Sequence, residues 1–250
     1  MGTKDGDFCA LELEDASLGL SYVMLDNTLA DLVDLRGKLA LAGMPSLEVA
    51  RWFVTEKGAR RALGFAAANA LSQCLFSRAG FEFDCSTDSV GRLAPGPQDH
   101  VGMIGHFTPL IPRIVASGAR LTVAEIDPAF LGDHASYRVT LDASELQGCN
   151  KILSTSTVLL NDTFDDILTH CRAAEWVAMV GPNAGCLPDP LFARGVGTLG
   201  GVQVVNRDAF VSALTRGERW GAFVRKYAIT RAEYPGAAAL IARVGAVMPR

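Results

Sequence analysis

The second half of the chain alternates short apolar runs with stretches of helical periodicity, and this alternation constrains the fold more than any other feature of the sequence. Strands are predicted at residues 101–104, 121–124, 151–153, 176–180 and 202–205. Helices fit between most of these runs, near residues 109–117, 142–147, 162–173 and 188–194, with another at 208–216. Strands that alternate with helices along the chain predict a parallel sheet with helices on both faces, which is a Rossmann-like α/β fold.

The first half of the chain has the pattern of a smaller α+β unit. Residues 8–14 and 18–25 alternate apolar and polar positions on either side of a turn, so they predict a β-hairpin. Helical periods follow at residues 28–35, 45–58 and 59–78. A hairpin followed by helices is typical of an α+β domain.

The segment from Phe81 to Gln98 is rich in turn-forming residues and poor in apolar periodicity, which is typical of a linker. We therefore expect an α+β domain at residues 1–90 and the Rossmann-like domain at residues 91–250. Two further apolar stretches, at residues 219–230 and 235–250, are interpreted as helices. We expect them to pack at the domain interface or against a partner subunit.

Charge and composition exclude several classes of protein. Lysine and arginine number 23 against 27 aspartates and glutamates, and no basic block follows a predicted face, so we expect no nucleic-acid partner. Apolar runs are too short for a membrane-spanning helix and the N-terminus lacks the apolar centre of a signal peptide, so we expect a cytoplasmic protein without a membrane partner. The 6 cysteines form no C-x-x-C pair, which favours free thiols over a structural zinc site.

The clearest functional signal is the stretch HVGMIGHF, at residues 100–107. An apolar strand, a turn with Gly102 and Gly105, and a helix begun at Thr108 and Pro109 would present backbone N–H groups to an anionic ligand. His106 and Phe107 follow the second glycine directly. The spacing is not G-x-G-x-x-G, so the alternative of close packing between strand and helix stays open.

Other polar residues follow the later strands, and the carboxyl ends of parallel strands meet at one edge of a sheet. Glu125 stands where such folds hydrogen-bond a ribose hydroxyl, or it caps the next turn. Thr155, Ser156 and Thr157 end the next strand, and Asn161 follows as a helix cap or a ligand contact. A glycine-bounded loop then presents Gly181, Pro182 and Asn183.

Metal binding requires separate consideration, because no pair of histidines has the spacing of a preformed zinc site. His106 either points into the expected cleft, as a ligand or an acid–base group, or is simply a half-exposed histidine. Cys186 follows the glycine-bounded loop and faces the expected cleft. The metal-ligating candidates are His106, Glu125 and Cys186.

Several stretches together resemble the putative heavy-metal chelation family of bacteria and archaea. They are GFAAANALSQ (64–73), VGMIGHFTPLIPRI (101–114), LTVAEIDP (121–128), STSTVLLNDTFDDIL (154–168) and GPNAGCLPDPLFARGVGTLGGVQVVNRDAF (181–210). The resemblance implies an N-terminal domain similar to the enolase N-terminal domain, a Rossmann-like C-terminal domain and a site in the cleft between them. It draws attention to Asn69, an amide in a small, apolar helix where a buried polar group needs a partner.

Three functions remain open. The first is binding or processing of a small anionic or metal-chelating ligand in the interdomain cleft. The second is an enzyme that depends on a nucleotide or S-adenosylmethionine type of cofactor, and the third is a non-catalytic, homodimeric regulatory or assembly protein. A divalent or heavy-metal ion and a nucleotide-like molecule are both candidate cofactors. The predicted ligand-binding residues are Asn69, Gly102, Gly105, His106, Phe107, Glu125, Thr155, Ser156, Thr157, Asn161, Gly181, Pro182 and Asn183.

Overall fold

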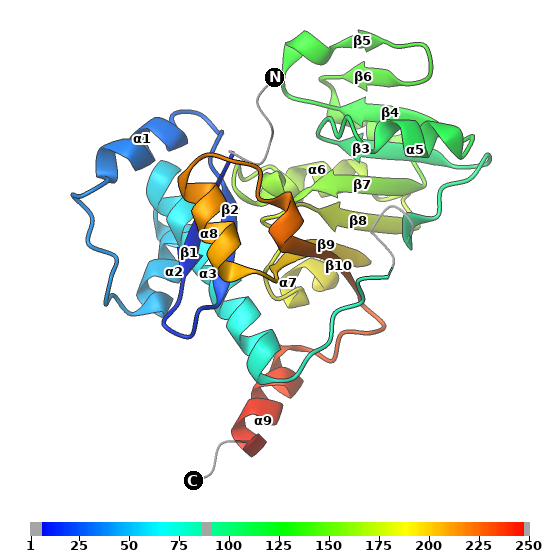
Figure 1. Ribbon diagram of the computed structural model, residues 1–250. Coiled ribbons are helices and arrows are strands. Elements are labelled where there is room, and N and C mark those ends of the chain that lie inside the picture. The colour runs from blue at the N-terminus through cyan, green and yellow to red at the C-terminus, as the bar shows by residue number, and fades with distance from the viewer. Residues whose placement is uncertain (1–6, 87–91, 248–250) are drawn as a thin grey trace.

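The N-terminal part of the computed structural model, which describes residues 7–86 and 92–247, is a β-hairpin followed by three helices (Figure 1). Strands β1 (Phe8–Glu12) and β2 (Leu18–Tyr22) pair antiparallel, with Phe8 opposite Tyr22. The helices are α1 (Thr28–Leu35), α2 (Ser46–Thr55) and α3 (Gly58–Arg78). The predicted hairpin and helices are confirmed.

Helix α3 is buried over most of its length because small residues let its neighbours approach its backbone. A Cβ atom at Gly19 of β2 would clash with the backbone of Ala66 and Ala70, and one at Gly64 would clash with the backbone of Phe53 in α2. The hairpin and α2 therefore pack directly onto α3. This close approach holds β2 and α2 directly against the backbone of α3.

The second part of the described chain is an eight-stranded sheet in the order β10-β9-β8-β7-β3-β4-β6-β5. Its strands are β3 (His100–Ile104), β4 (Arg120–Ala124), β5 (Gly132–Asp133), β6 (Arg138–Thr140), β7 (Lys151–Thr155), β8 (Trp176–Val180), β9 (Thr198–Val204) and β10 (Val224–Thr230). Strands β9, β8, β7, β3, β4 and β6 are parallel, while β5 and β10 are antiparallel edges. In chain order the parallel strands follow the 3-2-1-4-5-6 arrangement of a Rossmann fold.

Helical segments cover the sheet, and alternate residues of each strand face opposite layers. Val101 and Met103 of β3 join one core cluster with Ile111 and Ile114, whereas Ile104 joins the cluster on the other face. The helical segments are α5 (Ile111–Ala116), η2 (Pro128–Phe130), η3 (Ala143–Gly148), η4 (Ser156–Leu159), α6 (Phe164–His170), α7 (Asp189–Ala193), α8 (Arg207–Thr215), η5 (Gly221–Phe223) and α9 (Ala237–Val247). The predicted α/β class with a mostly parallel, helix-flanked sheet is confirmed.

Several element predictions need correction. The stretch at residues 219–230 was expected to be helical, but residues 224–230 form β10. This segment contains β-branched and aromatic residues and pairs along its whole length with β9, and Tyr227 is buried there. Strands β5 and β6 were missed because they have only 2 and 3 residues, too few for a period to show.

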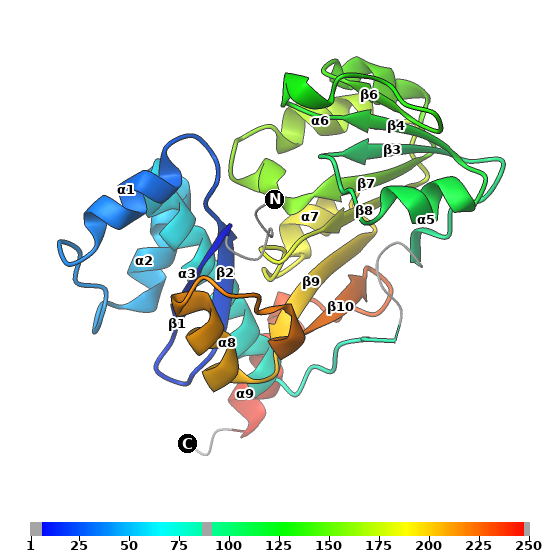
Figure 2. The same ribbon diagram turned by 45° about the horizontal axis from the view of Figure 1, so that its top comes forward.

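The hairpin also contacts the second half of the chain. Leu18 and Leu20 of β2 form a buried cluster with Phe210 and Ala213 of α8 and with Trp220. Figure 2 shows the hairpin between α3 and α8. The two parts therefore share a core.

The predicted domain boundary between residues 90 and 91 lies outside the described residues, so the division into two domains stays a prediction. In the described part of the chain, no helix is long and apolar enough to span a membrane.

Candidate functional site

The strand order places a topological switch between β3 and β7. From β3 the sheet continues through β4 and β6 in one direction, and from β7 it continues through β8 and β9 in the other. Loops that leave the carboxyl ends of β3 and β7 therefore diverge, and ligands of open α/β sheets bind at this position. The structure brings Gly105 and Thr155 together here, since a Cβ atom on Gly105 would lie 3.1 Å from Thr155 Cγ2.

The backbone N–H groups of residues 105–108, in the turn after β3, all donate hydrogen bonds within the protein, so the predicted open cradle of N–H groups is wrong. Gly105 N donates to Ala124 O at 2.9 Å, and Thr108 N donates to His106 O at 3.1 Å. His106 N donates to Glu125 Oε2 at 2.6 Å. The helix expected to start at Thr108 and Pro109 begins only at Ile111. The Glu125 carboxylate thus occupies a position that an anionic ligand would need.

Glu125 also accepts from Ile126 N at 2.8 Å, so it caps the turn that follows β4. This is one of the two roles considered from the sequence. The side chain is only half-buried, and a carboxylate has several lone pairs, so its oxygens can accept further hydrogen bonds. Glu125 therefore combines a structural contact with a negative charge at the sheet edge.

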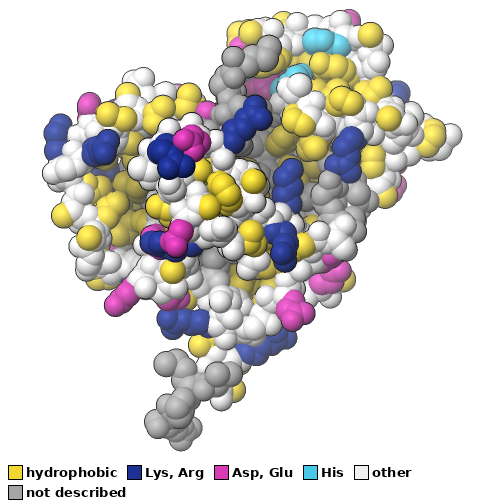
Figure 3. All heavy atoms as spheres, in the orientation of Figure 1, with side chains coloured by type: hydrophobic (Ala, Val, Ile, Leu, Met, Phe, Trp, Pro, Cys, Tyr) yellow, Lys and Arg dark blue, Asp and Glu magenta, His cyan; other side chains and the backbone are white. Residues whose placement is uncertain are grey.

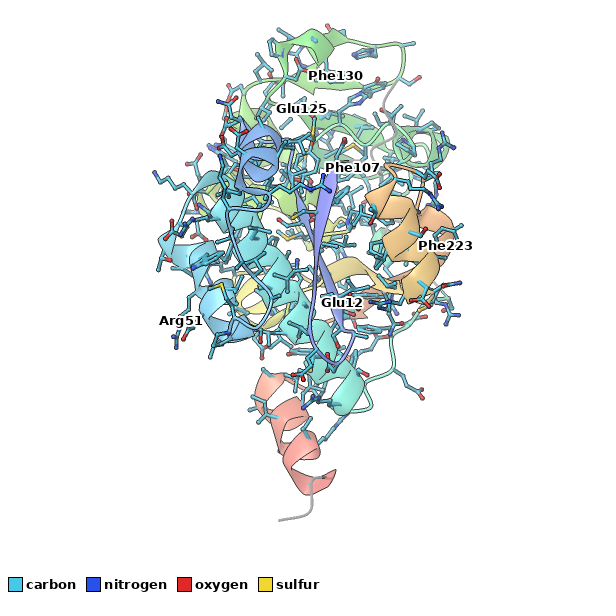
Figure 4. The ribbon with its side chains drawn as sticks, turned by 60° about the vertical axis from the view of Figure 1, so that its left-hand side comes forward. Glu12, Arg51, Phe107, Glu125, Phe130 and Phe223 are labelled. Carbon is cyan, nitrogen blue, oxygen red and sulfur yellow. The ribbon has the colours of Figure 1, made fainter. Side chains whose placement is uncertain are left out.

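His106 and Phe107 belong to packed groups on either side of the turn. The His106 ring stacks on Phe130 with centroids 4.5 Å apart, and its Nε2 lies 3.3 Å from Tyr137 Oη. Phe107 packs against the core cluster that includes Ile111. Figure 4 labels Phe107, Glu125 and Phe130, which lie on the side of the molecule away from Glu12 at the other end of the hairpin.

Gly102 lies within β3 rather than at the ligand-facing edge. A Cβ atom there would be 2.7 Å from Ile152 Cδ1 and 3.0 Å from Leu146 Cδ2. Close packing between the sheet and η3 accounts for this glycine, as the alternative interpretation of the motif allowed.

One buried hydrogen bond joins the loop after β7 to the loop after β8, and the loop after β7 has further hydrogen bonds of its own. Thr155 Oγ1 donates to Thr157 Oγ1 at 3.0 Å and accepts from Thr157 N at 3.2 Å. Ser156 Oγ donates to Asn183 Oδ1 at 2.6 Å. A Cβ atom on Gly181 would clash with Ser156 Oγ, and Pro182 is half-buried beside it. The predicted residues of these two loops thus form one unit.

Asn69 connects this unit to the N-terminal part. Its Nδ2 donates to Leu20 O at 2.7 Å and to Asn183 O at 2.9 Å, and both asparagines are 1% exposed. The Asn69 Oδ1 and Asn183 Nδ2 atoms are buried without a hydrogen-bond partner. The structure therefore brings Asn69 and Asn183 together.

A small pocket of about 60 Å³ lies where the two parts meet. Asn161, a predicted site residue, lines it, and its Oδ1 accepts from Thr163 Oγ1 at 2.6 Å. Arg61 of α3 also lines the pocket and forms a bidentate ion pair with Asp162. Its Nη1 lies 2.6 Å from Asp162 Oδ2, and its Nη2 lies 2.5 Å from Asp162 Oδ1. The complete lining is Tyr22, Leu25, Asp26, Thr28, Gly58, Arg61, Ala62, Leu160 and Asn161.

Tyr22 and Arg61 were missed by the sequence analysis. Tyr22 ends β2, and burial together with the negative charges of Asp7 and Glu125 raises its pKa above the ordinary value of 10.0. Glu125 is therefore close enough to Tyr22 to influence its ionisation. The available signal for Tyr22 was a polar aromatic residue inside the predicted strand at residues 18–25, and the signal for Arg61 was a cation near the start of the predicted helix at residues 59–78.

The three metal-ligating candidates do not come together. Within the described residues, no group of three or more His, Cys, Asp or Glu side chains is arranged to hold a metal ion. Cys186 packs against the core cluster, and burial raises the pKa of its thiol to about 12. A thiol with a raised pKa carries little thiolate at neutral pH, which weakens it as a metal ligand.

Strand order, switch-point loops and the docked hairpin define a doubly wound α/β protein with an N-terminal α+β unit. Two family models, both described as "Putative heavy-metal chelation", match residues 7–72 and 91–233. The chain belongs to this putative heavy-metal chelation family, as the resemblance implied.

An uncharacterized protein of Methanocaldococcus jannaschii is 28% identical over 154 residues, which cover 59% of this chain and 56% of that protein. The chain thus spans just over half the length of this relative.

Two solved structures of proteins of unknown function share the fold. The one from Pyrococcus horikoshii has a TM-score of 0.65 and 20% identity and covers 89% of this chain and 88% of its own. The one from Desulfitobacterium hafniense has a TM-score of 0.68 and 21% identity, with coverages of 91% and 88%.

Proposed function

We propose that this protein binds a small, positively charged, metal-bearing ligand between the end of the hairpin and the carboxyl ends of β3, β4 and β7. The observation that supports the proposal is that Tyr22, which lines the pocket where the two parts meet, lies within the electrostatic influence of Glu125 at the sheet edge. They come from the two parts of the chain, and the charge of Glu125 contributes to the raised pKa of Tyr22. A ligand between them would contact both parts at once.

The charges around the proposed site favour a cation over the anion expected from the sequence. Glu125 already accepts the hydrogen bond from His106 N, so an anion would have to displace it. Arg61, the cation that lines the neighbouring pocket, is paired with Asp162. A ligand with a positive charge and N–H or O–H donors would complement Glu125 and the Tyr22 hydroxyl.

Binding of a preformed metal complex fits these residues better than direct chelation by the protein. The family description points to metals, yet the described side chains offer no three-ligand group. The Cys186 thiol is held protonated by burial. In the proposed arrangement the small molecule supplies the metal ligands, and the protein recognises the outer surface and charge of the complex.

Thermal-shift and calorimetric titrations with hexaamminecobalt(III) test this proposal, because this inert cation carries N–H donors and exchanges no ligands with protein. We expect it to raise the Tm, and we expect Glu125→Gln to weaken its binding about tenfold through loss of a charged hydrogen bond. Metal-free citrate, an anionic chelator, should not bind. The exposed residue Glu82, beyond the far end of α3, provides Glu82→Gln as a control that leaves binding unchanged.

Two results would contradict the proposal. One is stronger binding of metal-free citrate than of hexaamminecobalt(III). The other is stoichiometric binding of free Co²⁺ that does not respond to Glu125→Gln, which would assign direct chelation to other residues.

A nucleotide or S-adenosylmethionine type of cofactor is the second candidate. One observation favours it: Glu125 directly follows β4, the second strand of the Rossmann order, where an acidic residue binds ribose hydroxyls. S-adenosylmethionine and AMP at millimolar concentration would then raise the Tm, and Glu125→Ala would abolish the effect. Absence of any shift with both compounds would exclude this candidate.

A further inference from the structure

The small pocket where the two parts of the chain meet, here called the junction pocket, has room for a short chemical group. Its volume of about 60 Å³ exceeds the roughly 10–15 Å³ that a single ordered water needs. Leu25, Ala62 and Leu160 give it apolar walls, and Asp26 and Thr28 belong to the same lining. A group with a short alkyl part and a polar end therefore matches the pocket in size and character.

Thr28, the first residue of α1, is a buried polar residue of this lining, at 6% exposure. Its backbone N–H donates to Leu25 O at 3.0 Å, whereas its hydroxyl forms no hydrogen bond in the part of the chain that the structure describes. Among the described residues, Thr28 Oγ1 is not one of the unpartnered side-chain atoms that solvent cannot reach, so the pocket gives access to it. Buried hydroxyls normally have a partner, and this one therefore indicates a group that enters the pocket and binds there.

The charges around the junction pocket favour a cation as this group. Arg61 lines the pocket, but its charge is paired with Asp162, on which Lys57 also acts electrostatically. The Asp26 carboxylate lines the pocket and forms no ion pair with the described residues. The Asp31 carboxylate lies beside the first residue of α3, which is part of the lining as well. These carboxylates outnumber the two cations, so a positively charged group would be attracted.

We infer that the junction pocket binds a primary alkylammonium group, with its alkyl part against the apolar walls and its N–H donors toward Thr28 Oγ1 and the Asp26 carboxylate. A primary ammonium has three donors and no acceptor, which suits a hydroxyl and a carboxylate oxygen. The inference rests on the proposed function and names its ligand class, a metal complex of an amine-bearing chelator. Tyr22 connects the two regions, because it lines the pocket and lies within the electrostatic influence of Glu125.

Nuclear magnetic resonance of ¹⁵N-labelled protein tests the inference with ethylammonium as the probe, at constant ionic strength. Ethanol has a similar size without the charge, tetramethylammonium has the charge without N–H donors, and K⁺ is a cation without an alkyl part. We expect saturable shifts of the backbone amide signals of Thr28 and Gly58 with ethylammonium only. The amide of Gly195, which follows α7 and does not line the pocket, is the control and should not move.

The variant Thr28→Val keeps the branched shape of the side chain but replaces the hydroxyl by a methyl group. We expect it to weaken ethylammonium binding about tenfold, through loss of a hydrogen bond to a charged group. Its free energy of unfolding in urea should not fall, because the hydroxyl has no partner in the described part of the chain to lose. A merely structural role of Thr28 would lower the stability and leave the affinity of the folded protein unchanged.

The variant Asp26→Asn tests the charge independently of Thr28. Asparagine tolerates the φ of +48° that Asp26 adopts, so the backbone should be kept. We expect ethylammonium binding to weaken at least about tenfold, because a charged hydrogen-bond acceptor is lost. The exposed control Glu82→Gln should leave the affinity unchanged.

Three results would overturn the inference: no saturable shift with ethylammonium, equal shifts with ethanol or K⁺, or unchanged affinity in Asp26→Asn or in folded Thr28→Val. If ethylammonium fails while hexaamminecobalt(III) still depends on Glu125, only this inference is lost. If the cobalt complex fails while ethylammonium binding depends on Thr28 and Asp26, the pocket stands as an alkylammonium site and the proposed metal-bearing ligand is wrong.

Discussion

At the scale of single residues, the proposed site depends on the electrostatic coupling between Tyr22 and Glu125, which can be measured. Burial is the main cause of the raised pKa of Tyr22, and the charges of Asp7 and Glu125 add to it. Glu125→Gln removes one of these charges and should therefore lower the pKa of Tyr22. A titration followed by ¹³C signals of tyrosine, assigned with Tyr22→Phe, measures the change.

The same shift sets a pH dependence of stability. The folded-state pKa of Tyr22 lies above its ordinary value of 10.0, so its contribution to the free energy of unfolding is fully present below pH 10. The contribution is lost as the pH rises through the folded-state pKa. Urea unfolding should be measured from about pH 8 to about pH 11, a range that contains the ordinary pKa of tyrosine. The free energy of unfolding should fall more steeply with rising pH in wild type than in Tyr22→Phe.

Gly181 is the residue whose replacement should be most disruptive in the loop after β8. Its φ of +151° disfavours any side chain, and a Cβ atom would also clash with Ser156 Oγ. We expect Gly181→Ala to lower the free energy of unfolding by about 2–4 kcal/mol. Gly195→Ala is the matched control: φ is +98° there, but open space surrounds the Cβ position, so the loss should be only about 1 kcal/mol. Equal losses in urea unfolding would mean that the contact with Ser156 contributes nothing.

At the scale of elements, α3 is connected to the loop after β7 through Arg61 and Asp162. The Arg61 side chain is 14% exposed, so removing its partner leaves a largely buried charge. We expect Asp162→Asn to lower the free energy of unfolding by about 1 kcal/mol. Glu218→Gln, in an exposed pair with Arg216, should cost less than about 0.5 kcal/mol.

The Arg61 pair also predicts the direction of an acid effect. Hydrogen bonding from Arg61 lowers the pKa of Asp162 below its ordinary value of 3.8. Its stabilising contribution is present above that value and is lost as the pH falls through the folded-state pKa. Asp162→Asn should lack this part of the acid destabilisation, and an unchanged acid profile would show that the pair contributes nothing to stability.

The long periodic elements could be predicted from the sequence, whereas short strands and contacts between distant segments could not. The pattern of α3 and the apolar runs of β3, β4 and β8 are local, so single-sequence reasoning finds them. Strand β10 was mistaken for a helix because only its pairing with β9 reveals its conformation. The partners of Glu125 and Asn69 depend on which loops the sheet order brings together. Predicting Glu125 at a strand end was thus possible, but predicting that it closes the turn at His106 was not.

At the scale of the whole molecule, the predicted homodimer stays a prediction, and the surface suggests where to test it. Helices α1 and α2 each expose apolar side chains on one face, and Figure 3 shows hydrophobic side chains on this part of the surface. They include Val33 at 63% exposure and Val54 at 84%. Among the described side chains of helix α9, the one exposed large apolar residue is Ile241, at 60%.

We therefore expect any dimer to form through α1 and α2 rather than through α9. The double variant Val33→Lys and Val54→Lys should then sediment as a monomer, since two like charges would enter the apolar contact. Ile241→Lys is the matched control and should leave the sedimentation coefficient unchanged. Dissociation by Ile241→Lys alone would assign the interface to α9, and a monomeric wild type would reject the dimer.

The central claim is that the ligand lies between the hairpin and the sheet edge, in contact with both parts of the chain. Crystals soaked with hexaamminecobalt(III) test it directly, because anomalous scattering locates cobalt without assumptions about its ligands. We predict a cobalt peak between Tyr22 and Glu125 that disappears in crystals of Glu125→Gln. Cobalt found only elsewhere on the surface, or at this position with equal occupancy in both proteins, would contradict it.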